Sequence, residues 1–261
     1  MIRRLRRATL AILLVAAPGL AAAAQPVVSI VIDDIGDNPD TGQRAVDLPG
    51  PVACAFLPGT PYAHSLAERA HRQGKEVLLH QPMQAVAHND LLGPGALMLH
   101  MTEPRFLHTL RDNLQSLPYV VGVNNHMGSL LTRHPGHMTW LMRELKREGD
   151  LFYVDSRTTR HTVAEQMAHE VGVPTTRRNV FLDNRLSKEA IRDQFLELVR
   201  DAREEGHALA IGHPHPKTLA VLEQEIPKLA AQGVRLVPVF TLLQTIHQEP
   251  RTPQWHASAS Q

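Results

Sequence analysis

The sequence predicts a single α/β domain with about seven parallel strands, and two observations support this prediction. Seven short runs rich in β-branched and apolar residues recur along the chain, at residues 27–33, 51–57, 76–80, 119–125, 151–156, 207–213 and 234–240. Most of the intervals between these runs carry an apolar pattern with the period of an α-helix. Alternating strands and helices are typical of a parallel sheet, which leaves an α/β barrel and a doubly wound sheet as the two candidate folds.

The helical pattern is found in six segments, at residues 61–73, 103–117, 135–148, 163–171, 187–205 and 216–232. Thr102 and Ser187 stand directly before or at the start of two of these segments, as N-cap residues do. Glycines follow four of the predicted helix ends, at Gly74, Gly149, Gly206 and Gly233. We therefore expect one domain over residues 25–246, with helices between successive strands.

Composition narrows the classes of function. The chain has 261 residues, of which 43% are hydrophobic and 20% charged, so it can bury a core large enough for a single domain. Its formal net charge is +1, from 27 Lys and Arg against 26 Asp and Glu, which gives no electrostatic attraction for nucleic acid or an acidic membrane surface. The 16 histidines are notable because neutral imidazole is a common metal ligand.

The two ends of the chain differ in character from the predicted domain. Residues 1–24 join the cationic "MIRRLRR", the apolar "ATLAILLVAAPGL" and the small "AAAA", as in a secretory signal peptide. An uncleaved membrane anchor is the alternative, although the apolar run is short for a bilayer span. Residues 247–261 are polar, and we expect a flexible tail there with no membrane span after signal cleavage. Cys54 is the only cysteine, so we expect no internal disulfide and a buried thiol.

Polar side chains gather where the predicted strands end. They are Asp33, Asp34, His80, Asn124, Asn125, His126, Asp155, Ser156, His213 and His215. Because the carboxyl ends of parallel strands form a single face, residues far apart in sequence are expected to meet there. This convergence predicts a functional site.

Each of these residues alone also has a structural interpretation. Adjacent aspartates can cap a helix or form a turn, and a lone His80 or His126 can be a hydrogen-bonded core residue. Their joint occurrence at strand ends favours a site. A carboxylate with two imidazoles suits zinc or another first-row divalent ion. Since side chains alternate along a strand, Asp33 and Asp34 cannot point the same way unless the strand twists at the pair.

Six ordered motifs also carry a family resemblance: "VSIVIDDIGDN", "GKEVLLHQPMQ", "NDLLGPGAL", "VGVNNHMGS", "FYVDSRTT" and "ALAIGHPHP". Over about residues 27–244 the chain resembles the divergent polysaccharide deacetylase family, the YibQ-like exported proteins of Gram-negative bacteria. The resemblance implies a distorted (β/α) barrel of about seven strands. It also implies a periplasmic, metal-dependent hydrolase that removes acetyl groups from an acetylated glycan or peptidoglycan.

The resemblance also implies roles for the strand-end residues. Asp33 corresponds to the general base and His213 to the general acid. Asp34, His80 and His126 correspond to ligands of a divalent metal, with zinc the expected ion.

Three further residues take supporting roles by the same resemblance. Asp155 would orient the general acid or bind substrate. Asn124 or Asn125 would hold the acetyl group or the water at the metal.

One departure from the family pattern leaves two functions open. Ordinary members carry two histidines a few residues apart on one loop, whereas "LLHQPMQ" offers only His80. The third ligand is then His126, or the metal is lost or bound more weakly. The alternative to a deacetylase is a catalytically degraded glycan-binding or cell-envelope factor that keeps the fold, whose protein partners the sequence does not identify.

Overall fold

The structure is a computed structural model that describes residues 25–248. The predicted signal peptide, residues 1–24, and residues 249–261 of the predicted tail lie outside the described residues. The boundary expected at residue 246 falls within the last helix, which extends to Gln248.

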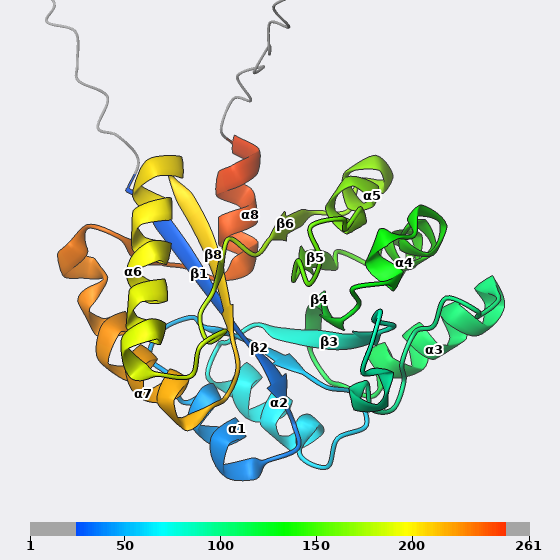
Figure 1. The fold of residues 1–261 in the computed structure, drawn as a ribbon, viewed down its shortest axis with the longest axis horizontal. Coiled ribbons are helices and arrows are strands. Elements are labelled where there is room, and N and C mark those ends of the chain that lie inside the picture. The colour runs from blue at the N-terminus through cyan, green and yellow to red at the C-terminus, as the bar shows by residue number, and fades with distance from the viewer. Residues whose placement is uncertain (1–24, 249–261) are drawn as a thin grey trace, which may run out of the picture.

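One parallel sheet organises the described chain (Figure 1). Its strands are β1 (Val27–Ile35), β2 (Ala53–Phe56), β3 (Val77–Met83), β4 (Val120–Met127), β5 (Phe152–Asp155), β6 (Thr175–Arg177), β7 (Val180–Phe181), β8 (His207–Gly212) and β9 (Arg235–Leu236). They lie in the order β6-β5-β4-β3-β2-β1-β8-β7, with β9 also paired to β1. The sheet curves into a barrel that stays open between β6 and β7, so the predicted distorted (β/α) barrel is confirmed.

Helices cover the outside of the curved sheet (Figure 1). They are α1 (Pro39–Val46), α2 (Ala63–Arg72), α3 (Glu103–Gln115), α4 (Pro135–Glu148), α5 (Ala164–Val171), α6 (Lys188–Glu205) and α7 (Pro216–Glu225). The last helix, α8 (Val239–Gln248), packs instead against the opposite face of the strands. The larger apolar core packs between strands and outer helices and includes Cys54, which is fully buried as expected. In the span from residue 25 to residue 248, no helix has the length and apolar character needed to cross a membrane.

Helix boundaries follow the expected local signals in part. Ser187 caps α6, with its hydroxyl accepting a hydrogen bond of 3.1 Å from the N–H of Ala190, and Gly206 ends that helix at φ +81°. Thr102 precedes α3 but its side chain makes no capping hydrogen bond. Helix α1 was not predicted from the sequence. It begins after Asn38, whose side chain accepts hydrogen bonds from the N–H groups of the first turn.

The segment at residues 234–240 is mostly not a strand, contrary to the sequence prediction. Only Arg235–Leu236 pairs with β1, and α8 begins at Val239. The carboxylate of Glu76 accepts hydrogen bonds of 2.6 and 2.8 Å from the N–H groups of Val239 and Phe240, which caps the helix from a distant loop. Such a tertiary cap overrides the β-propensity of "VRLVPVF" because propensity is only a weak prior.

Helix α8 contributes to a second apolar cluster, separate from the core beneath the outer helices. Val239, Leu242 and Leu243 pack in this cluster with apolar residues of the strands, including Leu78 of β3 and Leu209 of β8. Strand side chains that point away from the outer helices are thereby covered, so the polar strand ends are carried on a packed scaffold.

Gly122 of β4 permits a close approach of β5. A Cβ atom at this position would lie 2.4 Å from the Phe152 ring, and Phe152 is itself buried. We expect Gly122→Ala to lower the free energy of unfolding by about 1–3 kcal/mol because the ring or the strand must shift. Denaturant unfolding measures this change. Gly136→Ala is the matched control, since its added Cβ would meet its nearest atoms at 3.5 Å; equal stability of the two variants would contradict the prediction.

Candidate active site

The end of β1 turns at the paired aspartates. Asp34 has φ +54°, a left-handed conformation that Asp tolerates better than most residues, and the pairing of β1 with β2 shifts register between Ile32 and Ile35. Asp33 is almost fully buried, whereas the Asp34 side chain is about one-third exposed. Both carboxylates nevertheless face His80, whose Nε2 lies 3.7 Å from Oδ2 of Asp33 and 3.1 Å from Oδ1 of Asp34. The strand therefore turns at the pair, as side-chain alternation requires for two adjacent residues that reach one site.

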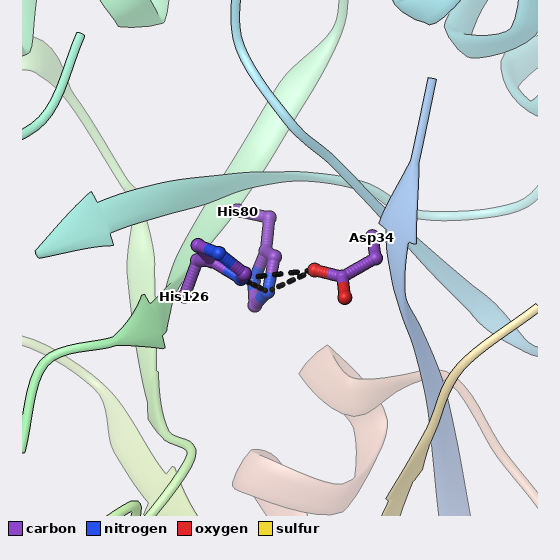
Figure 2. Close-up of side chains that lie close together, drawn as sticks. All are labelled: Asp34, His80 and His126. Carbon is purple, nitrogen blue, oxygen red and sulfur yellow. Dashed lines mark hydrogen bonds and ion pairs between the residues drawn. The ribbon is translucent and has the colours of Figure 1, made fainter. Parts of the chain in front are cut away.

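Asp34 of β1, His80 of β3 and His126 of β4 come together at one edge of the sheet (Figure 2). Oδ1 of Asp34 lies 2.9 Å from Nδ1 of His126 and 3.1 Å from Nε2 of His80, and these two nitrogens are 3.2 Å apart. The same carboxylate oxygen is buried and has no hydrogen-bond partner within residues 25–248. An orphaned buried oxygen facing two imidazole nitrogens fits a divalent metal ion, for which carboxylate and imidazole are suitable ligands.

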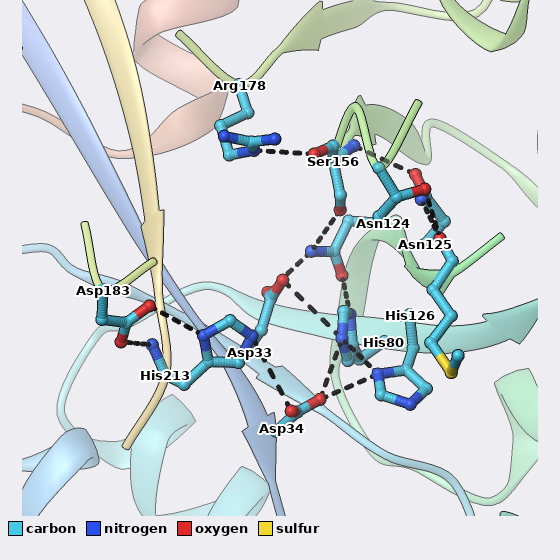
Figure 3. A network of polar contacts seen from close by, with 12 residues as sticks. Asp33, Asp34, His80, Asn124, Asn125, His126, Ser156, Arg178, Asp183 and His213 are labelled. Atoms are coloured by element: carbon cyan, nitrogen blue, oxygen red, sulfur yellow. Dashed lines mark hydrogen bonds and ion pairs between the residues drawn. The ribbon is translucent and has the colours of Figure 1, made fainter. Parts of the chain in front are cut away.

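Asn124 of β4 fixes the orientation of His80 (Figure 3). Its side-chain NH₂ donates to Oδ1 of Asp33 at 2.7 Å, so its carbonyl oxygen must face Nδ1 of His80, which lies 2.8 Å away. Nδ1 of His80 therefore carries a proton, which leaves Nε2, the ring nitrogen nearest Asp34, as the one that can bind a metal ion. Metal-ligating histidines are commonly held in this way by a partner on the second ring nitrogen.

Electrostatics separates the two adjacent carboxyls. Burial raises the pKa of Asp33, and the nearby imidazoles of His80 and His213 offset this only in part. Burial opposes ionisation of Asp34 as well, but the contacts with His126 and His80 hold the pKa of Asp34 far below its usual range. Neighbouring groups whose pKa values are pushed apart are suited to different tasks. Asp34 is the permanent anion, and Asp33 is the carboxyl that exchanges a proton more readily.

His213 follows β8 and is held by Asp183. Nδ1 of His213 lies 2.9 Å from Oδ1 of Asp183, whose Oδ2 accepts hydrogen bonds from the His213 N–H and the Thr218 hydroxyl. Nε2 of His213 lies 3.8 Å from Oδ2 of Asp34. Burial lowers the pKa of His213, but the carboxylates of Asp183, Asp33 and Asp34 outweigh burial and raise it to about 9. His213 is therefore a protonated group at neutral pH in the metal-free protein.

We expect the imidazole of His213 to titrate near pH 9 in the metal-free protein, against an ordinary value of 6.5. Because the folded-state pKa is raised, its contribution to stability is complete below about pH 6.5 and is lost as pH rises through about 9. NMR titration of labelled histidine measures the pKa. Asp183→Asn should lower it toward 6.5, and a His213 pKa unchanged by that substitution would contradict the assignment of Asp183 as its partner.

Asp155 does not contact His213, and its expected role in orienting that residue falls to Asp183. Oδ1 of Asp155 accepts a hydrogen bond of 2.8 Å from the N–H of Arg157, and Oδ2 accepts one of 2.8 Å from the Thr162 hydroxyl. Both oxygens thus hold the loop after β5. Sequence reasoning missed Asp183 because β7, which precedes it, has only two residues and gives no strand pattern.

Asn125 is likewise used within the protein. Its Oδ1 accepts hydrogen bonds from the Tyr153 hydroxyl at 2.9 Å and the Ser156 N–H at 3.0 Å, while its NH₂ donates to the Met127 carbonyl. These contacts join the ends of β4 and β5. Of the two asparagines, Asn124 is the one whose side chain contacts the predicted ligand His80 and the predicted base Asp33.

A cavity of about 420 Å³ opens beside these groups. The residues that bear charge or ionisable groups in its wall are Asp33, His80, His126, Arg157, Arg178 and His213. The two arginines, which follow β5 and β6, were not predicted from the sequence. A larger hollow of about 1010 Å³ near His207 is lined by none of the predicted site residues. The smaller cavity is therefore the candidate active site.

The match to known families covers most of the barrel. Residues 30–243 match the family described as divergent polysaccharide deacetylase. The chain belongs to this family. One relative, the uncharacterized protein YibQ of Escherichia coli (strain K12), is 36% identical over 229 residues, which are 88% of this chain and 71% of YibQ.

Solved structures show the same fold as this chain. An uncharacterized protein from Agrobacterium tumefaciens C58 superposes with a TM-score of 0.80 at 22% identity, covering 86% of this chain and 92% of that one. The catalytic domain of peptidoglycan N-acetylglucosamine deacetylase from Eubacterium rectale superposes with a TM-score of 0.53 at 16% identity, covering 85% and 92%. At these identities the similarity establishes a carbohydrate deacetylase-like barrel.

Proposed function

We propose that the protein is an exported, zinc-dependent hydrolase that removes acetyl groups from a polysaccharide or peptidoglycan sugar. The observation that carries this proposal is the buried Oδ1 of Asp34, which has no hydrogen-bond partner within residues 25–248 and faces His80 and His126. Asp33 and His213 line the cavity together with these two histidines. Family membership and the barrel shared with a peptidoglycan deacetylase support it. The sequence of residues 1–24 supports export to the periplasm.

The donor set favours zinc among divalent metals. Asp34, His80 and His126 would supply one oxygen and two nitrogens, a three-residue set that leaves positions free for water and substrate. When bound, such an ion supplies Lewis acidity and lowers the pKa of water in the cavity. His126 thereby takes the place of the second histidine that "LLHQPMQ" lacks.

Two side chains on the cavity would move the protons. Asp33, held by Asn124, is placed to accept a proton from the attacking water, and its raised pKa suits a general base. His213, held at Nδ1 by Asp183, directs Nε2 toward Asp34 and is placed to protonate the departing amine or hydroxyl oxygen of the sugar. The hydrolysis of an acetyl amide or ester needs both transfers.

Acetate release from acetylated glycans tests the proposal. The panel contains N-acetylglucosamine oligomers, O-acetylated xylan and peptidoglycan glycan strands. We expect the zinc-loaded protein to release acetate from at least one of them and the chelator-treated protein to lose that activity. Binding of glycan by zinc-loaded protein without acetate release would overturn the hydrolase proposal and favour the glycan-binding or cell-envelope factor.

A further inference from the structure

The loop after β5 holds Arg157 in a fixed position on the cavity. The N–H of Arg157 donates to Oδ1 of Asp155 at 2.8 Å, and its carbonyl accepts from Nη2 of Arg178 at 2.9 Å. Nε of Arg178 also donates to the carbonyl of Ser156 at 2.7 Å. Two largely buried side chains from β5 and from beyond β6 thus fix the backbone on both sides of Arg157.

The backbone of Arg157 lies in a conformation that favours glycine. Its φ is +49°, where a non-glycine side chain is uncommon. Strained positions persist only where surrounding contacts enforce them, and they gather at functional sites. An arginine at such a position, on the wall of the catalytic cavity, indicates that its side chain is what the loop presents.

The two arginines on the cavity differ in their partners. The guanidinium of Arg178 donates to two carbonyls, and its Cζ lies 4.7 Å from the centroid of the Phe181 ring. Arg178 therefore helps to hold the wall of the cavity in place. The guanidinium of Arg157 makes no hydrogen bond or ion pair with any residue between 25 and 248, although Arg157 is partly buried. Asp155, the acidic residue nearest in sequence, already uses both oxygens on Arg157 N–H and Thr162.

We propose that Arg157 is a specificity-determining residue that binds a carboxylate of an acidic glycan while the acetyl group faces Asp33. This inference rests on the proposed deacetylase function and names its substrate class. A free guanidinium presents a planar fork of donors that matches a carboxylate, whereas a neutral sugar offers no group of opposite charge. The carboxylate belongs either to a uronic acid or to the lactyl ether of a muramic acid residue.

The substitution Arg157→Gly removes the side chain of Arg157 but keeps the backbone turn, so it tests the side chain by itself. Glycine adopts φ +49° freely, so the fold should be retained, with an unfolding temperature no lower than that of the parent protein. We expect the ratio of kcat/KM for acidic glycans to that for N-acetylglucosamine oligomers to fall at least tenfold. Arg157→Lys should recover part of the ratio. Acetylated oligogalacturonate and muramic-acid-containing glycan strands are assayed in parallel to identify the source of the carboxylate.

The control is Arg160→Gln, which removes one positive charge from an exposed position three residues along the same loop. This variant should have the same ratio of kcat/KM for acidic glycans to kcat/KM for N-acetylglucosamine oligomers as the parent protein. Binding of the acidic oligosaccharides to zinc-loaded protein, measured by calorimetry, is a second readout that needs no turnover. It should weaken at least tenfold in Arg157→Gly, and binding by the parent should weaken with added salt.

The outcomes separate this inference from the proposed function. If the parent, Arg157→Gly and Arg160→Gln release acetate with the same ratio of kcat/KM for acidic over neutral glycans, the role of Arg157 is overturned. The hydrolase proposal would then be unaffected. Loss of acidic-glycan binding in Arg157→Gly without acetate release by any protein would support Arg157 as a binding residue and overturn the hydrolase. Equal calorimetric binding by the parent and Arg157→Gly would overturn the role of Arg157 even without turnover.

Discussion

Asp34→Asn is expected to lower the zinc affinity of the protein by at least about 100-fold, more than the loss usually seen when only a ligand's supporting partner is changed. The Asp34 carboxylate provides the anionic oxygen that faces His80 Nε2 and His126 Nδ1 at 3.1 and 2.9 Å. Asparagine tolerates the left-handed backbone at φ +54°, so the substitution removes charge without forcing the strand end to move. Calorimetric zinc titration and metal analysis of purified protein measure the change.

The matched control for this substitution is Asp37→Asn, three residues along and exposed. It should bind zinc as the parent does. Zinc should also raise the unfolding temperature of the parent and of Asp37→Asn, since a ligand that binds only the folded state stabilises it, and should raise that of Asp34→Asn far less. Zinc affinity unchanged in Asp34→Asn would contradict the metal centre and remove the basis of the proposed function.

His126→Ala tests, by the same zinc titration, whether His126 takes the place of the second histidine that the usual histidine loop carries. In the proposed metal site His126, from β4, would take the place of the missing second histidine, while His80 comes from β3. If the three residues act as one ligand set, His126→Ala should weaken zinc binding as Asp34→Asn does. Binding that depends on Asp34 and His80 but not on His126 would leave a weaker two-residue site.

The strand ends were predictable because parallel topology is a strong constraint. Asp33, His80, Asn124 and His213 all follow runs of buried apolar residues, and the rule that such ends share one face predicts that these residues meet. The family resemblance then predicted the barrel, which the structure confirms, and separate roles for Asp33 and Asp34, which stay predictions. The sequence therefore predicted the fold class and the group of residues around Asp34.

Contacts that depend on short or irregular segments were not predictable. Asp183 follows a strand of two residues, and Arg157 and Arg178 lie in loops, where no periodic pattern marks the residues. Asp155 shows the consequence: its place at a strand end suggested a partner for His213, but the turn at Arg157 takes its carboxylate. Helix α8 was mistaken for a strand because its cap, Glu76, is remote in sequence.

Asp33→Asn is expected to reduce kcat for acetate release by about 10²–10⁴-fold while zinc remains bound. In the parent protein Asn124 links Asp33 to the His80 imidazole. The amide of Asp33→Asn can still accept the hydrogen bond from Asn124, so the orientation of His80 should persist. Since burial raises the pKa of Asp33, its ionised form is held at a cost to folding above that pKa. The unfolding temperature of metal-free Asp33→Asn at neutral pH should therefore not fall.

The adjacent carboxylates give this prediction its sharpest control, because Asp33→Asn and Asp34→Asn make the same chemical change one residue apart. The first should keep zinc and lose turnover, and the second should lose both. Acetate release, metal content and unfolding temperature are measured on the same preparations. Turnover retained in Asp33→Asn would show that another group accepts the proton. Loss of zinc from Asp33→Asn would show that the two aspartates act together as metal ligands. In that case the strand twist at Asp34 does not separate their roles.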